Sequence, residues 1–431
     1  MLRGMASRRG GRKCRRVIGI PARAANLLGM QTTERRPSAR KMRLVARVAA
    51  GAAGLVALAA LLDAATYDAR AWRADFETLK LDMAQHYANL DWIAEHRGVD
   101  APALARRTES EIDTAYSRVR AYLAVRRFVG AFADPHLRLE GREAPSAGAP
   151  AGAGASAAPR QETADCGSAG YEEGDHGFAF PFERISGWRP ISGGSFPTGA
   201  IGRTGVLRIA ELGENRYLAA CRARFRVGLT ARELQLAVRA GLQAELKARL
   251  DQLRRAGAER VIVDLTGNGG GSEWVGEVVS LFTARELSRE APRLASPDCD
   301  RSDVWRSRPA CPVLAPAGEA ARIRGQGAWT GPVLILANRG TASAAEDFVA
   351  WLKGSGVARL AGERTAGAGC GYVNGGHVTR FAAAPVQVKM PNCARFLPDG
   401  RNEIEGIAPD VALPMDRPEE AATALAGLIG P

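Results

Sequence analysis

Ser343 stands at the junction between an apolar strand, predicted over residues 333–338, and an amphipathic helix that begins directly after it. A strand-to-helix corner exposes its first side chain and points free backbone N–H groups at whatever that side chain attacks. A serine presented in this way is suited to act as a nucleophile. The alternative is that Ser343 only caps the helix, a position that serine favours.

A glycine-rich segment is the second candidate for chemistry. It reads Asp264-Leu-Thr-Gly-Asn-Gly-Gly-Gly271 and follows a buried strand predicted over residues 261–265. Glycines let the backbone approach a ligand closely and turn its N–H groups inward. A phosphate-binding loop is not indicated, because the Gly-Lys-Ser/Thr ending is missing and the Gly-x-Gly-x-x-Gly spacing is not matched. The alternative is a tight turn, and Asp264 is expected to be structural.

The elements that must carry these segments alternate between strand and helix, which predicts a layered α/β core. A strand over residues 205–210 precedes a long helix that starts at the capping box Thr230-Ala-Arg-Glu233. A late hairpin is predicted from residues 377–381 and 386–390. Residues 70–133 have helical periodicity, and a second helix there is expected to start at Thr108-Glu-Ser-Glu111. Residues 141–175, rich in Gly, Ala, Ser and Pro, are expected to form a linker or flexible insertion.

The positive charge of the chain is confined to its beginning. The formal net charge is +13, and residues 1–47 contain 14 Lys and Arg but one acid, so the rest of the chain is close to neutral. A body without basic excess does not favour nucleic-acid binding. Residues 48–62 then form an uncharged apolar run that fits an export signal or, if uncleaved, a short membrane anchor. Met42 would give this signal a compact positive start, which favours translation from Met42.

Export changes how the cysteines are interpreted. Six of the seven lie in the part expected to be exported, and an oxidising compartment is compatible with three disulfides. Sequence does not fix the pairing, and the preferred hypothesis joins nearest neighbours: Cys166–Cys221, Cys299–Cys311 and Cys370–Cys393. No CxxC pair or His-x-x-x-His spacing occurs, so no metal site is expected.

Four ordered motifs resemble those of the tail-specific serine peptidases, the family that includes the carboxyl-terminal processing peptidases and the tricorn core protease. They are residues 261–271, residues 338–346, Gly362-Glu-Arg-Thr-Ala-Gly367 and Ile404-Glu-Gly-Ile-Ala-Pro-Asp410. The resemblance implies an α/β core like that of the ClpP/crotonase superfamily. It also implies Ser343 as the nucleophile and an oxyanion hole from the backbone N–H groups of Gly270 and Ala344. The implied reaction is cofactor-free hydrolysis of peptide or protein substrates through an acyl-enzyme.

The base is where this chain departs from the processing peptidases. Those enzymes pair the serine with a lysine in a Gly-Lys-Gly segment, and the corresponding residues here are Gly367-Ala368-Gly369. The tricorn-like branch uses a histidine and a glutamate instead, and Asp134-Pro-His136-Leu resembles its Asp-Gly-His-Thr segment. His136 is therefore predicted as the general base and Glu405 as the carboxylate that orients it. His377 is the alternative base, and Asp410 and Glu403 are the alternative carboxylates.

These predictions divide the chain into a basic tail (1–47), a signal or anchor (48–65), a helical subdomain with His136 (70–140), a linker or insertion (141–200), a peptidase core (201–415) and a C-terminal tail or short helix (416–431). The segment before residue 205 is too short for an intact PDZ domain, which many family members use to hold a substrate's C-terminus. The expected location is the periplasm or cell envelope. A non-catalytic ligand-binding protein on the same fold and an esterase are the alternative functions.

Overall fold

The computed structural model describes residues 39–142, 162–296, 302–306 and 314–430. Its chain divides into two compact units, residues 1–61 and 62–431. Helix α1 (Ala39–Ala65) contains the apolar run of residues 48–62, and most of the predicted basic tail lies outside the described residues. No single helix among those described is long and apolar enough to span a membrane. One consecutive pair of helices, Ala50–Ala65 and Ala69–His86, meets the criteria of length and composition only when its two members are taken together.

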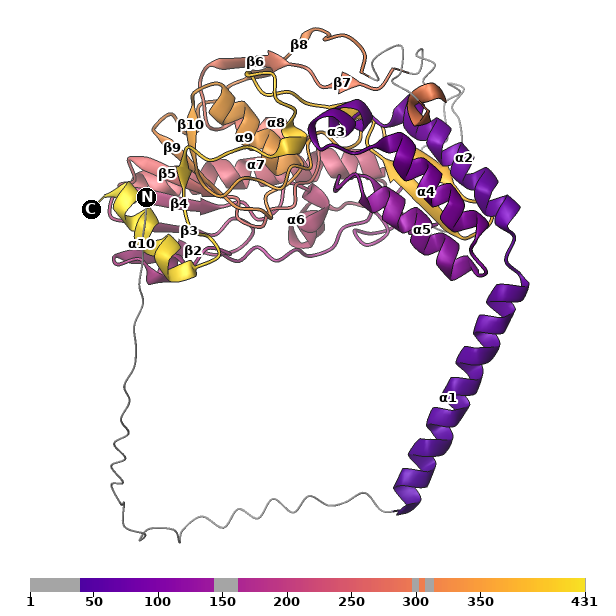
Figure 1. The fold of residues 1–431 in the computed structure, drawn as a ribbon. Helices are drawn as coiled ribbons and strands as arrows, with labels where there is room; N and C mark the ends of the chain where they lie inside the picture. Colours follow the sequence, from indigo (N-terminus) through magenta and orange to yellow (C-terminus); the bar gives the residue numbers. More distant parts are fainter. Residues whose placement is uncertain (1–38, 143–161, 297–301, 307–313, 431) are drawn as a thin grey trace, which may run out of the picture. The chain divides into compact units, whose positions relative to one another are not determined.

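A seven-stranded sheet forms the centre of residues 62–431 (Figure 1), in the order β14-β10-β9-β5-β4-β3-β2. Its strands are β2 (Trp188–Ser192), β3 (Thr198–Ile201), β4 (Thr204–Arg208), β5 (Arg260–Asp264), β9 (Val333–Ala337), β10 (Ala358–Gly362) and β14 (Val411–Ala412). The strands from β14 to β4 run parallel, whereas β3 and β2 are antiparallel to their neighbours. This confirms the predicted α/β class.

The sheet also corrects the expected linker over residues 141–200. Residues 143–161 lie outside the described residues, but β2 and β3 extend the central sheet, and Phe182 beside them is fully buried. The polar and glycine-rich composition of the segment concealed two short strands, the edge strand β2 and its neighbour β3, because short strands carry few apolar residues to reveal them.

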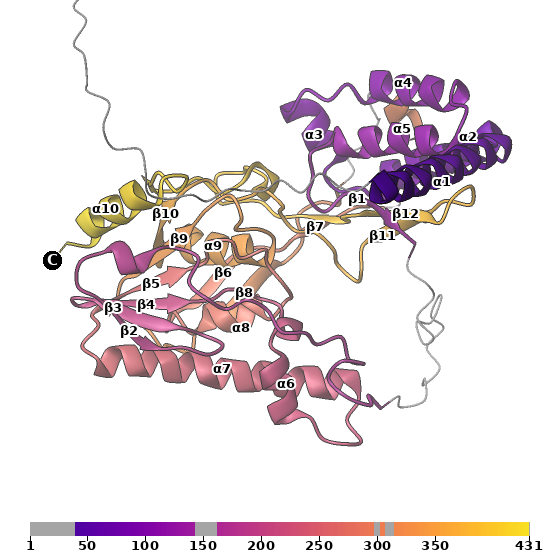
Figure 2. The same cartoon turned by 90° about the horizontal axis from the view of Figure 1, so that it is seen from below.

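Helices cover both faces of the sheet. Successive residues of a strand point to opposite faces, so neighbouring residues pack against different helices. Val261 and Val263 pack with Leu242 on the side of α6 (Leu218–Arg224), α7 (Ala231–Arg255), α8 (Val275–Ser280) and α9 (Ala344–Gly354). Ile262 instead packs with Leu425 of α10 (Pro418–Ile429). Figure 2 shows α7 and α10 on opposite sides of the sheet. The predicted capping box is present at the start of α7, where Thr230 and Glu233 exchange hydrogen bonds.

The helical subdomain consists of α2 (Ala69–His86), α3 (Leu90–His96), α4 (Ala101–Asp113) and α5 (Arg118–Gly130). It is tied to the core through a three-stranded sheet in which β1 (Arg138–Gly141) pairs with β12 (Val386–Met390), and β12 with β11 (His377–Arg380). The last two strands confirm the late hairpin. The helix start predicted at Thr108 is wrong: Thr108 lies inside α4, where its Oγ1 donates to the Leu104 carbonyl, and Ser117 caps the next helix.

Two further strand pairs complete the described structure around the site. β6 (Glu286–Glu290) pairs with β8 (Ala320–Arg324), and β7 (Arg293–Leu294) pairs with β13 (Cys393–Ala394). Two of the predicted disulfides, Cys166–Cys221 and Cys370–Cys393, are present. The third predicted pair, Cys299 and Cys311, lies outside the described residues.

Candidate active site

Ser343 occupies the predicted corner between β9 and α9. Its backbone has φ 55° and ψ −116°, which is unusual for a residue with a side chain. Such a conformation costs roughly 1–3 kcal/mol and persists only where the surroundings fix it. The Ser343 N–H donates to Glu346 Oε2 at 2.9 Å, and the Ser343 carbonyl accepts from the Asp347 N–H at 3.0 Å. The nucleophile predicted from sequence is therefore held on both sides by the first turn of α9.

Glu346 is the anchor of the third motif, and the sequence analysis missed it. Its side chain is fully buried and accepts from the Ser343 N–H and from four further donors, at distances between 2.6 and 3.2 Å: Thr365 Oγ1 and the N–H groups of Gly367, Ala368 and Gly369. Burial raises the pKa of Glu346, while the bonds from Thr365 and Gly367 act against that shift. The sequence does contain a signal for this residue, because Ser343 and Glu346 have the Ser-x-x-Glu spacing of a capping box.

The glycine loop lies directly against Ser343. The Ala342 N–H donates to the Asn268 carbonyl at 2.9 Å, and the Asn268 side chain accepts from the Gly270 N–H at 2.8 Å. That bond corrects the prediction that the Gly270 N–H is an open oxyanion donor. Gly270 contributes space instead, because a Cβ atom there would lie 2.7 Å from Ser343 Cβ and 2.8 Å from the Ala344 nitrogen.

The Ala344 N–H is the open donor beside this space. Among the described residues it makes no hydrogen bond, as expected for the first residue of a helix. Asp264, at the end of β5, is structural as predicted: its Oδ1 accepts from both the N–H and the hydroxyl of Thr266, and Arg208 lies 3.4 Å away.

His136 is buried and has a defined orientation. Its Nδ1 lies 2.8 Å from the Ala368 carbonyl oxygen. A carbonyl only accepts, so Nδ1 carries the proton, and Nε2 of the neutral ring keeps a lone pair. Burial lowers the pKa of His136 below its ordinary value, although Asp134 acts in the opposite direction. Asp134 Oδ1 also accepts from the His136 N–H at 2.9 Å, which fixes the turn that carries the ring.

The loop of residues 367–369 is therefore connected by hydrogen bonds to both the predicted nucleophile and the predicted base. Through Glu346 it is bonded to the Ser343 N–H, and through the Ala368 carbonyl to the His136 ring. No hydrogen bond between the Ser343 and His136 side chains occurs within the described part of the chain. Gly371 continues the loop under the ring, where a Cβ atom would lie 2.9 Å from His136 Cε1.

The predicted bond between Glu405 and His136 is not made. Glu405 Oε1 accepts from Trp92 Nε1 at 3.0 Å, and the Ala368 carbonyl takes the place beside the imidazole. The alternative carboxylates have other partners, because Asp410 pairs with Lys353 and Glu403 with arginines. The alternative base His377 pairs with Asp82 at 3.2 Å and stacks on His86, away from the contacts of Ser343.

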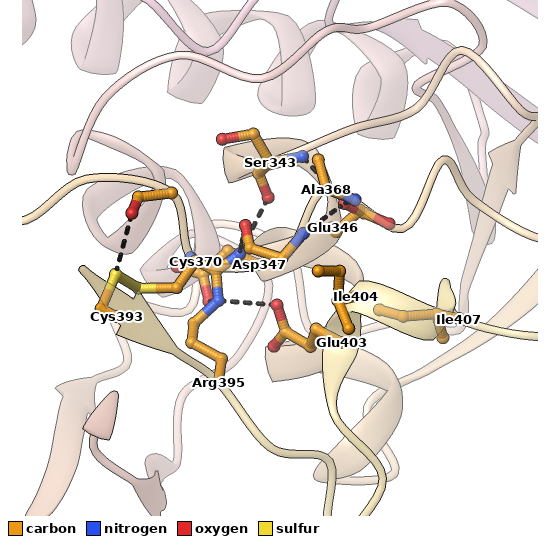
Figure 3. A network of polar contacts seen from close by, with 12 residues as sticks. Ser343, Glu346, Asp347, Ala368, Cys370, Cys393, Arg395, Glu403, Ile404 and Ile407 are labelled. Atoms are coloured by element: carbon orange, nitrogen blue, oxygen red, sulfur yellow. Dashed lines mark hydrogen bonds and ion pairs between the residues drawn. A yellow bond between two sulfur atoms is a disulfide. The ribbon is translucent and has the colours of Figure 1, made fainter. Parts of the chain in front are cut away.

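A buried cluster of ion pairs contacts the backbone of Ser343 (Figure 3). Arg395 Nε donates to Glu403 Oε2 at 2.6 Å, and its Nη2 donates to the carbonyls of Ser343 at 3.1 Å and Gly369 at 2.9 Å. Burial lowers the pKa of Arg395, but Asp347 and Glu403 outweigh this and hold it above its ordinary value. Arg289 pairs with the same two carboxylates.

Comparisons with known proteins identify a peptidase family and similar folds. Residues 203–413 match the model of peptidase family S41. Similar solved structures are a putative peptidase from Parabacteroides merdae (14% identity, 83% of this chain and 96% of that chain, TM-score 0.53) and mature CPAF complexed with lactacystin (14% identity, 84% and 97%, TM-score 0.56). No curated protein sequence matches this chain. At this level of identity, the structural likeness speaks for the fold alone.

The matched segment contains the glycine loop, the Ser343 corner, the loop that binds Glu346 and His136, and the Glu403 turn. Residues 203–413 accordingly form a peptidase family S41 domain, and the chain is a serine-type peptidase.

Proposed function

We propose that this peptidase cleaves peptide bonds through an acyl-enzyme on Ser343, with His136 as the general base. The observation that carries the proposal is the shared loop of residues 367–369, which is bonded both to the Ser343 backbone through Glu346 and to the His136 ring through Ala368. Because Ala368 corresponds to the lysine of the Ser-Lys peptidases, the base comes from the helical subdomain instead.

The proposed reaction assigns a role to Ser343 Oγ, to His136 Nε2 and to the Ala344 N–H. Ser343 Oγ attacks the substrate carbonyl while His136 Nε2 takes the hydroxyl proton. The carbonyl oxygen becomes an oxyanion in the space beside Gly270, where the Ala344 N–H is the nearest open donor. The amine then leaves with the proton from His136, and a water molecule attacks the acyl-enzyme by the same route in reverse.

A fluorophosphonate tests this chemistry on the full chain. Ser343 Oγ would form a bond to phosphorus, fluoride would leave, and the phosphoryl oxygen would occupy the oxyanion position. Mass spectrometry should locate the label on Ser343, and Ser343→Ala should abolish it. Ser355→Ala is the matched control, because Ser355 lies at the other end of α9 and its hydroxyl donates to backbone carbonyls of that helix. Absence of the label from the wild-type chain, or its survival in Ser343→Ala, contradicts the proposal.

The unlabelled wild-type enzyme must also be tested on substrates. Hydrolysis of an unfolded protein such as casein supports the peptidase reaction. Turnover of p-nitrophenyl acetate without any cleavage of casein favours the esterase alternative. Binding of a ligand by a chain whose Ser343 does not react favours the non-catalytic alternative.

Export is part of the proposal. The apolar run of residues 48–62 after Arg43 and Arg47 fits a signal or anchor, and the pairs Cys166–Cys221 and Cys370–Cys393 suit an oxidising compartment. Cell fractionation combined with thiol alkylation tests this proposal. Recovery of the folded protein in the cytoplasmic fraction with reduced cysteines would contradict it.

A further inference from the structure

Arg395 has a buried guanidinium group that takes no direct part in the proposed reaction. It directly follows β13, its side chain is 9% exposed, and one nitrogen, Nη2, donates to the carbonyls of both Ser343 and Gly369. The first carbonyl belongs to the nucleophile and the second to the loop that orients His136. We propose that Arg395 is a positioning residue, which sets the Ser343–Ala344 peptide and the 367–369 loop at a fixed distance from each other. The proposal rests on the proposed function of Ser343.

The geometry of the peptide unit explains how Arg395 acts on the oxyanion site. The Ser343 carbonyl and the Ala344 N–H belong to one planar trans peptide, so they point in opposite directions. By holding the carbonyl on one side, Arg395 directs the Ala344 N–H to the other side, where Gly270 leaves space. Rotation of this peptide would turn the open donor away from the position of the developing charge.

The conformation of Ser343 makes such a constraint necessary. With φ at 55°, Ser343 has a conformation that side-chain residues avoid, and it relaxes unless its surroundings hold it. Glu346 holds the N–H group that precedes the Ser343 Cα, and Arg395, together with the Asp347 N–H, holds the carbonyl that follows it. The local contact from Glu346 and the long-range contact from Arg395 thus act on opposite ends of the same strained residue.

The surrounding charges favour a positioning role over one in stability alone. Arg395 and Arg289 share the carboxylates of Asp347 and Glu403, so the cluster holds two cations and two anions. A buried cluster of this kind is often no more stable than apolar residues of similar volume, because each charge must be removed from water. It does, however, place a cationic donor at one defined point, and that point lies between two active-site carbonyls.

The test measures how fast a fluorophosphonate labels Ser343 in the full chain, as a function of its concentration. This separates the maximal rate of inactivation from the half-saturating concentration. In Arg395→Met the maximal rate should fall on the order of 10²-fold, as for the loss of an oxyanion donor, with the half-saturating concentration close to the wild-type value. Arg395→Lys keeps a cation beside Glu403 but lacks the planar fork of donors. It should regain thermal stability while its maximal rate stays low.

Arg289→Met is the matched control, because it removes the other cation from the same two carboxylates yet touches neither carbonyl. Its maximal rate should remain near the wild-type value even if its unfolding temperature drops as far as that of Arg395→Met. The proposal is overturned if Arg395→Met reacts at the wild-type rate, if both variants lose rate in proportion to stability, or if Arg395→Lys restores the full rate. A wild-type chain that is not labelled at Ser343 overturns the proposed function, and this proposal with it.

Discussion

At the scale of single residues, a backbone carbonyl lies beside the proposed base, where most hydroxyl–imidazole–carboxylate triads have a carboxylate. The Ala368 carbonyl fixes the His136 ring and its tautomer, but it brings no full negative charge to stabilise the imidazolium. The nearest carboxylate on the His136 turn, Asp134, accepts from the His136 backbone N–H rather than from the ring. A base in this setting should be weak but already deprotonated at neutral pH.

The pH dependence of labelling follows from that setting. Burial lowers the pKa of His136, so the neutral, active ring is retained at pH values below about 6.5, where a free histidine would become protonated. The rate of fluorophosphonate labelling should fall as the pH is lowered, with a midpoint below pH 6.5. His136→Gln should lower the plateau on the order of 10²–10⁴-fold. A midpoint above 6.5 would show that another group is the base.

The same shift affects stability in a defined direction. The unfolded chain takes up a proton on His136 near pH 6.5, whereas the folded chain resists it. Stability from this residue is therefore present above pH 6.5 and is lost as the pH falls toward the folded pKa. His136→Gln should flatten this part of the stability curve, as measured by thermal unfolding between pH 5 and pH 8.

Gly270 should be essential because of the space it leaves. A Cβ atom there would lie 2.7 Å from Ser343 Cβ, at a φ of +105°. Gly270→Ala should therefore reduce labelling on the order of 10²-fold or more. Gly267→Ala is the control: Gly267, in the same loop, has a φ of +71° but no atom within 4 Å of an added Cβ. Equal losses in the two variants would mean that backbone strain, and not the filled space, is responsible.

At the scale of elements, the segment of residues 367–371 connects every part of the site. Glu346 binds its N–H groups, Arg395 binds the Gly369 carbonyl, and the His136 ring rests against Gly371. The Cys370–Cys393 disulfide then fastens this segment to β13, the strand that directly precedes Arg395. The proposed nucleophile, the proposed base and Arg395 thus all contact one short stretch of loop or residues bonded to it.

The two disulfides should accordingly differ in what their removal costs. In the chain-entropy model, the 55-residue separation of Cys166 and Cys221 is worth about 4.2 kcal/mol and the 23-residue separation of Cys370 and Cys393 about 3.4 kcal/mol. Replacing the first pair by alanine should lower the unfolding free energy at least as much as replacing the second. Only the second replacement should also slow labelling of Ser343 in protein that is still folded. Slower labelling in both variants alike would assign the effect to stability.

At the scale of the whole molecule, the site is assembled from two parts of the chain. Ser343 comes from the α/β core, His136 from the helical subdomain, and the sheet of β1, β12 and β11 joins the two. Asp75 of α2 reinforces the junction by accepting from the N–H groups of Ala382 and Ala383, at 2.9 and 2.8 Å. The helical subdomain thus carries the proposed base, and the core carries the proposed nucleophile.

The strongest sequence patterns predicted the parts of this architecture that depend on local structure. The strand before Ser343, the capping box of α7, the late hairpin and two disulfides are confirmed because each depends on local periodicity, capping or nearness in sequence. The choice between Glu403 and Glu405 was beyond sequence, because both lie in one 3₁₀ turn (Glu403–Glu405) and point to different surroundings, Arg395 and Trp92. Arg395 was also missed, since its partners lie up to 52 residues away.

The joint between the two parts gives the last prediction. Phe381 is fully buried and packs edge-to-face on Trp72 of α2, with ring centroids 5.8 Å apart. Phe182 is equally buried, but it lies on the α10 face of the sheet. Each Phe→Ala change should lower the unfolding free energy by about 3–5 kcal/mol.

Only Phe381→Ala should also slow the labelling of Ser343, because it loosens the helices that carry His136 against the core that carries the serine. The measurement compares labelling rates at a temperature where circular dichroism shows both variants folded. Wild-type labelling in Phe381→Ala would mean that His136 keeps its place without this contact. A loss in Phe182→Ala of the same size would mean that general stability controls the rate.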